Sequence, residues 1–238
     1  MIKIEKIAYG DEENIFAGTI CYDDSTTSRR PGVLVVHSFK GHSDFEVEKA
    51  VELAKLGYLG FAVDMYGAGR RASTPDEARA LMKELDDDRP LLLERIRLAL
   101  DTLKVQSQVD PEKLAGIGFC FGGKCLLDLI RSGTEIQGIV SFHGVYDQPP
   151  ERHEDQIRSS ILILHGWDDP LGTPEQTLEL ARELTERGAD WQILAFGNTG
   201  HSFTNPAARM PEQGLVYNQR SNDRAWLAMT NFLAEIFR

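Results

Sequence analysis

Three residue types that together can carry out nucleophilic catalysis follow apolar segments of this chain. Cys120 stands in the glycine-rich stretch 118–122, directly after the apolar run 114–117. Asp169 and His201 come later, each behind another apolar run. A cysteine thiolate attacks a carbonyl carbon, a histidine exchanges protons with the reacting groups, and an acid orients the histidine. These residues therefore indicate a cysteine-dependent acyl-transfer site.

The segment around Cys120 is typical of a nucleophile elbow, in which a strand turns sharply into a helix and presents a reactive side chain. Gly118 and Gly122 suit such a turn, since bulky residues there would clash with the adjacent strand and helix. The partial positive charge at the N-terminus of the following helix favours thiolate over thiol. The alternative is that Cys120 is a small buried apolar residue, as free cysteine often is.

Composition narrows the class of protein. The chain has 238 residues, of which 42% are hydrophobic and 26% charged, which suits one globular domain or two small ones. A net charge of −11 makes nucleic acid and anionic membranes poor partners. Three cysteines without framework spacing indicate a reducing compartment, and we expect a cytoplasmic protein. The N-terminus lacks the apolar core of a signal peptide, and no apolar run is long enough to span a bilayer.

Apolar runs alternate with amphipathic helical patterns along the chain. Alternation of this kind predicts an α/β fold, with a mostly parallel sheet and helices on both faces. Functional sites of such sheets lie beyond the C-terminal ends of the strands, where Cys120, Asp169 and His201 fall. Their chain order of nucleophile, acid and histidine is that of the α/β-hydrolase fold. The predicted strands are 2–7, 15–22, 33–36, 58–63, a strand from 114 into the elbow, 138–142, 161–164 and 191–196, with a turn at 110–111.

Five segments resemble the dienelactone hydrolase family of α/β-hydrolases. The resemblance implies a compact single-domain α/β-hydrolase over residues 1–238, which cleaves a small-molecule ester or lactone through a thioester intermediate. It implies no metal and no organic cofactor. We expect a monomer or a small homo-oligomer. The segments are 35–41 (VVHSFKG), 56–67 (LGYLGFAVDMYG), 116–123 (GIGFCFGG), 165–169 (HGWDD) and 200–203 (GHSF).

The chemistry of such a site gives each of the three residues a role. Cys120 attacks the carbonyl carbon, His201 holds the thiolate as an ion pair and later activates water, and Asp169 orients the imidazole. The choice of acid rests on the family pattern G-x-x-D, which selects Asp169 after Gly166. Asp168 is the alternative acid, with capping or solvent contact as its ordinary role.

Two backbone N–H groups are expected to form the oxyanion hole. One is that of Phe121, the residue after the nucleophile. The family match puts the second at Phe39. The sequence departs from the family at Ser38, where the first loop often carries a glutamate, and at Asn205, where the prototype carries an arginine for the substrate carboxylate. The prediction is therefore a small ester, lactone or thioester, without a commitment to dienelactone itself.

Substrate is expected to contact four side chains near the predicted strand ends. Tyr66 and Trp167 lie just beyond strand ends. Ser38 lies in the loop 37–41, and Ser202 directly follows His201. Each large aromatic residue has a structural alternative as part of the core or the pocket wall.

The remaining histidines are weaker candidates. His37 fits the family's strand-end position and is expected to line the pocket. His143 and His165 also end strands, and we expect hydrogen-bonded histidines near the site, whereas His42 and His153 are expected at the surface. No His, Asp and Cys residues have the tight spacing of a zinc site.

Two other functions are compatible with parts of this pattern. Glutamine-amidotransferase-like or peptidase-like cysteine enzymes also use a cysteine elbow. Amidotransferases of that type place a glutamate two residues after the histidine, and Phe203 occupies that position here. A non-catalytic binding domain on the hydrolase scaffold would not need the complete set of Cys120, Asp169 and His201.

Overall fold

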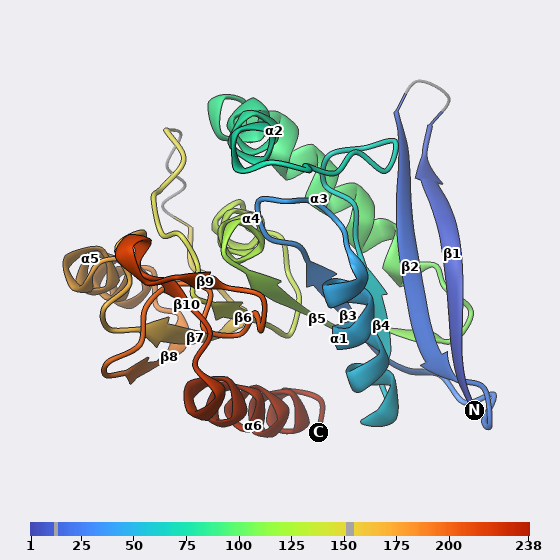
Figure 1. Cartoon of the computed structure of the whole chain (residues 1–238). Helices are drawn as coiled ribbons and strands as arrows, with labels where there is room; N and C mark the ends of the chain where they lie inside the picture. Colours follow the sequence, from blue (N-terminus) through green and yellow to red (C-terminus); the bar gives the residue numbers. More distant parts are fainter. Residues whose placement is uncertain (12–13, 151–154) are drawn as a thin grey trace. The chain divides into compact units, whose positions relative to one another are not determined.

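The computed structural model describes residues 1–11, 14–150 and 155–238, which form two compact units (Figure 1). The first unit is Met1–Ile117 and the second is Gly118–Arg238. Strands and helices alternate in both, as the sequence predicts. His153 lies outside the described residues. Over the described ranges, every helix is too short or too polar to cross a bilayer.

Strands of the first unit run in the order β1-β2-β4-β3. The hairpin of β1 and β2 is antiparallel, β2 pairs antiparallel with β4, and β3 pairs parallel with β4. β5 leads from this unit into the second. The predicted turn at 110–111 is wrong, because both residues already belong to β5; a proline is tolerated near the start of a strand. The bounds are β1 (Ile2–Gly10), β2 (Ile15–Asp23), β3 (Arg30–Val36), β4 (Leu59–Ala62) and β5 (Val109–Phe119).

Helices cover both faces of the strands in the first unit. A Cβ atom on Gly60 would lie 2.7 Å from the backbone of Ala50 in α1, and one on Gly32 would lie 3.0 Å from Leu103 in α3. Gly32 pairs with Leu59, the neighbour of Gly60. Because successive residues of a strand point to opposite faces, α1 and α3 lie on opposite sides. The helices are α1 (Asp44–Lys55), α2 (Pro75–Asp87) and α3 (Arg89–Lys104).

The second unit also has helices on both faces of its strands, which are parallel and run in the order β6-β7-β8. Phe142 in β6 stacks on Trp226 of α6, whereas His165 in β7 contacts Thr177 of α5. Phe142 pairs with Leu164, the neighbour of His165, so α5 and α6 cover opposite faces. The elements are α4 (Phe121–Arg131), β6 (Gly138–Phe142), β7 (Ser160–Gly166), α5 (Pro174–Glu186), β8 (Asp190–Phe196) and α6 (Gln219–Ile236).

The segment between β8 and α6 is more ordered than predicted. The sequence predicts β8 as the last strand and a loop behind it. The structure has two further short strands, β9 (Arg209–Met210) and β10 (Leu215–Val216), with the 3-10 turn η1 (Pro211–Gln213) between them. Two-residue strands are too short to carry a periodic apolar pattern, which is why the sequence does not reveal them.

His42 is buried rather than at the surface, so that expectation is wrong. Its Nδ1 lies 2.9 Å from Nη2 of Arg71, a residue far away in sequence. Burial lowers the pKa of His42, and the neighbouring Arg71 charge lowers it further. The ring is therefore neutral near pH 7 and accepts a hydrogen bond from the guanidinium through Nδ1.

Candidate active site

Cys120 has the backbone geometry of a nucleophile elbow. It joins β5 to α4 with φ 54° and ψ −113°, a conformation that non-glycine residues rarely adopt. Its N–H donates to the Phe142 carbonyl over 3.0 Å. A Cβ atom on Gly118 would lie 2.3 Å from the Gly122 carbonyl oxygen, so only glycine allows this close approach. The strained turn places the Cys120 residue at the N-terminal end of α4.

Asp169 and His201 form a buried pair. Nδ1 of His201 lies 2.7 Å from Oδ2 of Asp169. The other carboxylate oxygen accepts backbone N–H groups from Leu171 at 2.8 Å and Gly172 at 3.2 Å. Both oxygens are thereby fixed. Asp168 is exposed, so the structure places Asp169 and not Asp168 against the imidazole.

The electrostatic surroundings of His201 favour its charged form. Burial by itself lowers the pKa of this imidazole, but the charge on Cys120 and the hydrogen bond to Asp169 outweigh it and raise the pKa to about 10. Nε2 is buried and forms no hydrogen bond of good geometry with any residue that the structure describes. Since Nδ1 is engaged by Asp169, Nε2 is the atom left to exchange a proton.

The backbone of His201 is held by the segment that follows η1. Its N–H donates to the Gly214 carbonyl over 2.8 Å, and its own carbonyl accepts the Val216 N–H over 3.1 Å. Leu215 and His201 form an isolated parallel β-bridge. Sequence reasoning missed this support, because its contacts are made by backbone groups that any residue type possesses.

His143 and His165 lie near the pair, as expected. The His143 ring packs edge-on against His201 with centroids 4.9 Å apart, and its Nε2 lies 2.8 Å from Thr204 Oγ1. Burial, followed by the charge of His201, lowers the pKa of His143 well below its ordinary value. His165 contacts the Tyr146 hydroxyl through Nδ1 at 3.2 Å and Thr177 Oγ1 through Nε2 at 3.3 Å. His143 is thus a neutral neighbour of His201.

His37, in the first unit, is buried and fully hydrogen-bonded rather than open to a pocket. Its Nε2 lies 3.0 Å from the Met65 backbone nitrogen, and its Nδ1 lies 2.6 Å from the Ser38 carbonyl oxygen. A backbone N–H can only donate, so Nε2 is the acceptor and Nδ1 carries the hydrogen. Burial lowers the pKa of His37 to about 4, which keeps the ring neutral. The Ser38 carbonyl is therefore fixed by a permanent donor.

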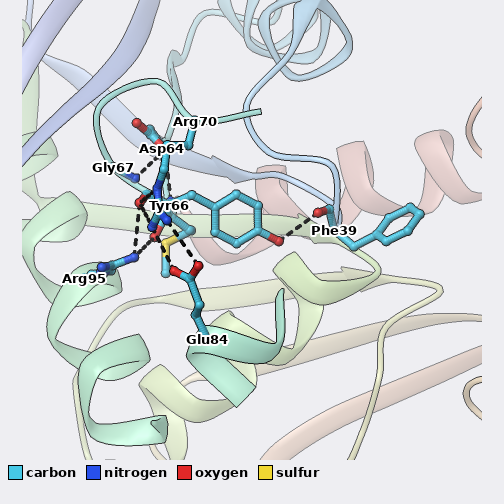
Figure 2. Close-up of polar contacts among 8 residues, drawn as sticks. Phe39, Asp64, Tyr66, Gly67, Arg70, Glu84 and Arg95 are labelled. Carbon is cyan, nitrogen blue, oxygen red and sulfur yellow. Dashed lines mark hydrogen bonds and ion pairs between the residues drawn. The ribbon is translucent and has the colours of Figure 1, made fainter. Parts of the chain in front are cut away.

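Tyr66 fixes the Phe39–Lys40 peptide, which follows the Ser38–Phe39 peptide in the loop after β3, as Figure 2 shows. Its hydroxyl donates to the Phe39 carbonyl over 2.8 Å, and its side chain is 1% exposed. Asp64 holds the backbone of Tyr66 in turn. Its Oδ1 accepts the N–H groups of Tyr66 and Gly67 over 3.0 and 2.9 Å. Arg95 donates to the Tyr66 carbonyl over 3.3 Å (Figure 2). Sequence reasoning missed Asp64 and Arg95 as supports of this loop.

The predicted substrate-contacting residues differ in exposure. In the first unit Ser38 is half-buried and Tyr66 is buried. In the second unit the Trp167 side chain is 46% exposed, and Ser202 is half-buried with φ 58°. Their roles toward a substrate stay predictions.

Parallel strands covered by helices on both faces, with a cysteine elbow, a buried aspartate and a histidine in that chain order, define an α/β-hydrolase. The sequence model of the dienelactone hydrolase family matches residues 16–237. The chain belongs to this family, and it is a carboxylic ester hydrolase. The predicted fold and family are thereby confirmed.

Solved structures agree over the whole chain. The structure named m3DLH is 39% identical, with a TM-score of 0.93, and the alignment covers 100% of this chain and 99% of that one. A dienelactone hydrolase-like promiscuous phosphotriesterase from metagenomic libraries is 35% identical, with the same TM-score and coverage of 100% and 99%. A carboxymethylenebutenolidase homolog of Xenopus tropicalis is 24% identical over 94% of this chain and 92% of that protein.

Proposed function

We propose that this protein hydrolyses a small carboxylic ester, lactone or thioester with Cys120 as nucleophile, His201 as proton carrier and Asp169 as orienting acid. The observation that carries the proposal is the buried 2.7 Å contact between His201 and Asp169, with Nε2 left over for the thiol. The charge of Cys120 acts on His201 strongly enough to raise the histidine's pKa, which supports proximity of the two groups.

The reaction proceeds in two halves. Sγ of Cys120, as thiolate, bonds to the carbonyl carbon and a tetrahedral intermediate forms. The intermediate collapses to a thioester as the alkoxide leaves, and Nε2–H of His201 gives this alkoxide its proton. His201 then takes a proton from water while the oxygen attacks the thioester. The carboxylic acid leaves, and Sγ is restored as thiolate beside the imidazolium. Asp169 holds Nδ1–H throughout and stabilises the charged ring.

Phe121 supplies one oxyanion donor in this proposal, because it directly follows the nucleophile and opens the first turn of α4. Phe39 is the second donor by family resemblance. The Ser38–Phe39 peptide has its carbonyl held by Nδ1 of His37 at 2.6 Å and by the Gly41 N–H at 3.2 Å. In a trans peptide the N–H points away from the carbonyl. Fixing the Ser38 carbonyl therefore fixes the direction of the Phe39 N–H.

The substrate class follows from the neutral residues at two family positions. Ser38 replaces a glutamate and Asn205 replaces an arginine that would bind a carboxylate. Serine cannot accept the thiol proton at neutral pH, so His201 performs this task in our proposal. Without the arginine, we infer a preference for uncharged acyl groups.

The test is hydrolysis of para-nitrophenyl acetate before and after treatment with iodoacetamide. The proposal predicts turnover that alkylation abolishes, and Cys120→Ala should abolish it equally while the protein stays folded. Cys21 is a suitable control thiol, because burial raises its pKa to about 11 and it is neutral at pH 7. Cys21→Ser should therefore leave both turnover and its sensitivity to iodoacetamide unchanged. Turnover that survives complete alkylation of Cys120 would contradict the proposal.

A phosphotriester serves as a second test substrate, because one relative of 35% identity is described as a promiscuous phosphotriesterase. We infer that any such activity uses the same cysteine. If Cys120→Ala abolishes ester hydrolysis but leaves paraoxon hydrolysis intact, the two reactions do not share this nucleophile.

A further inference from the structure

Tyr146 lies on the segment that follows β6, beside the turn that carries Asp169 at the end of β7. β6 and β7 are parallel neighbours, so the two segments leave their strands at the same edge. A Cβ atom on Gly172 would lie 3.2 Å from Cε2 of Tyr146, so the tyrosine ring packs directly against this glycine. The N–H of Gly172 donates to Oδ1 of Asp169 over 3.2 Å. Tyr146 therefore touches the turn that holds the proposed acid.

The hydroxyl of Tyr146 is buried and has no role in the proposed mechanism. Burial raises the pKa of Tyr146, and the negative charge of Asp169 raises it further. The hydroxyl therefore keeps its hydrogen near pH 7 and can donate it. It lies 3.2 Å from Nδ1 of His165.

One arrangement of hydrogens gives every side chain of this cluster a partner. Thr177 Oγ1 lies 3.0 Å from the Thr173 carbonyl oxygen, which can only accept, so the Thr177 hydroxyl donates to it. The same Oγ1 lies 3.3 Å from Nε2 of His165 and accepts the hydrogen of that nitrogen. Nδ1 then carries a lone pair, to which the Tyr146 hydroxyl donates. Burial lowers the pKa of His165, which keeps the ring neutral near pH 7.

These hydrogen bonds form a relay from Tyr146 through His165 and Thr177 to the Thr173 carbonyl. The relay begins and ends at the same turn. Tyr146 supports Gly172 with its ring, and Thr173, the next residue in the chain, receives the last hydrogen of the relay. A displacement of Tyr146 would therefore disturb the backbone that donates to Asp169.

The segment that carries Tyr146 is anchored by α4. The buried guanidinium of Arg131 donates to the Tyr146 carbonyl over 3.0 Å and to the Asp147 carbonyl over 3.1 Å. Lys124 of the same helix lies 2.9 Å from the Asp147 carboxylate. Since α4 begins directly after Cys120, one helix connects the proposed nucleophile to this segment.

We propose that Tyr146 is a positioning residue of the hydrolase: anchored by its hydrogen bond to His165, it holds the turn 169–172 that directs Asp169 at His201. The inference rests on the proposed roles of Asp169 and His201, and it gives Tyr146 no contact with substrate. Loss of the hydroxyl would leave Nδ1 of His165 as a buried acceptor without its donor and would release the ring from its anchor. The contact between Asp169 and His201 should weaken as a result.

The experiment is Tyr146→Phe, which keeps the ring and removes the anchor. We expect kcat on para-nitrophenyl acetate to fall about three- to tenfold with KM unchanged. The NMR midpoint of His201 should move to lower pH, because the hydrogen bond to Asp169 helps to raise that pKa. Tyr22→Phe makes the same change at a buried tyrosine of the first unit and should alter neither quantity.

A second set of variants tests the relay separately from the ring. Thr177→Val removes the acceptor for Nε2–H of His165 and should lower kcat, whereas Thr177→Ser keeps the hydroxyl and should retain the natural kcat. Combined with Tyr146→Phe, Thr177→Val should add little, because both changes break the same relay. Full additivity of the two losses would contradict the relay.

Three results for Tyr146→Phe would overturn the inference. The first is a kcat and a His201 midpoint equal to those of the natural protein. The second is a loss of kcat with an unmoved midpoint, and the third is a change in KM alone, which would place Tyr146 against the substrate. Failure of the proposed function looks different, since Cys120→Ala would then retain turnover. Circular dichroism of each variant establishes that the fold is retained.

Discussion

Oδ2 of Asp169 lies 2.7 Å from Nδ1 of His201, in the interior of the second unit. The carboxylate is fixed in turn by the N–H groups of Leu171 and Gly172. This pair determines which tautomer the imidazole adopts, because an ionised carboxylate accepts only from a protonated Nδ1.

Replacement of Asp169 by Asn should therefore impair catalysis through the tautomer of His201. An amide N–H₂ facing Nδ1 stabilises the wrong tautomer, and we expect kcat to fall by about 10²–10⁴. Asp168→Asn is the matched control: its carboxylate is exposed, and kcat should remain close to that of the natural enzyme. Steady-state kinetics on one ester compares the two variants. A larger loss for Asp168→Asn would mean that the acid is misassigned.

The raised pKa of His201 gives a prediction about pH. Its ordinary value of 6.5 is raised to about 10, so between these values the folded protein binds a proton that the unfolded chain releases. The stabilisation from this group is complete below about pH 6.5 and is lost as the pH rises to about 10. Cys120→Ala removes the largest influence that raises this pKa, and the midpoint of His201 should move to lower pH.

NMR titration of the histidine ring signals measures this midpoint directly, with His201→Gln to assign the resonance. His37 provides an internal reference, since its ring should stay neutral down to about pH 4 in both proteins. An unchanged His201 midpoint in Cys120→Ala would show that the thiol charge does not act on the imidazole.

The loop that carries Phe39 gives a third prediction. Tyr66→Phe removes the hydroxyl that donates to the Phe39 carbonyl and leaves the buried ring in place. We expect kcat to fall by about two- to tenfold with little change in KM, because the Phe39–Lys40 peptide, which follows the proposed oxyanion donor, loses the hydrogen bond that holds it. Tyr217→Phe, a half-buried tyrosine of the second unit, is the control. A change in KM alone would favour direct contact between Tyr66 and substrate, as the sequence predicts.

The sharp turn at Cys120 and the positions of Asp169 and His201 behind strands were predictable from sequence because local rules determine them. Glycine at position 118 is required by the close approach to Gly122, and Asp169 and His201 each follow an apolar strand. The family pattern G-x-x-D selected Asp169 over Asp168, and Asp169 is the residue that contacts His201. Signals of this kind occupy short stretches of chain and are readable without knowledge of tertiary contacts.

The errors concern contacts between distant segments. His42 has the sequence surroundings of a loop residue, but Arg71 folds against it. His37 resembled a pocket residue, yet Met65 and Ser38 use both of its nitrogens. Local composition cannot identify such partners, because their proximity is decided by how the whole unit packs.

The central claim is that Cys120 forms a covalent acyl-enzyme. Rapid mixing with para-nitrophenyl acetate, acid quenching and mass spectrometry of the digested protein tests it directly. We predict one acetyl group on the peptide that contains Cys120, formed in a burst with para-nitrophenol and lost at the rate of turnover. In His201→Ala the acetyl group should form slowly, because no imidazole accepts the thiol proton, and once formed it should persist, because deacylation also needs the imidazole. Active enzyme with no acetyl group on Cys120 under any of these conditions, or an acetyl group that turns over on another residue, would contradict the account.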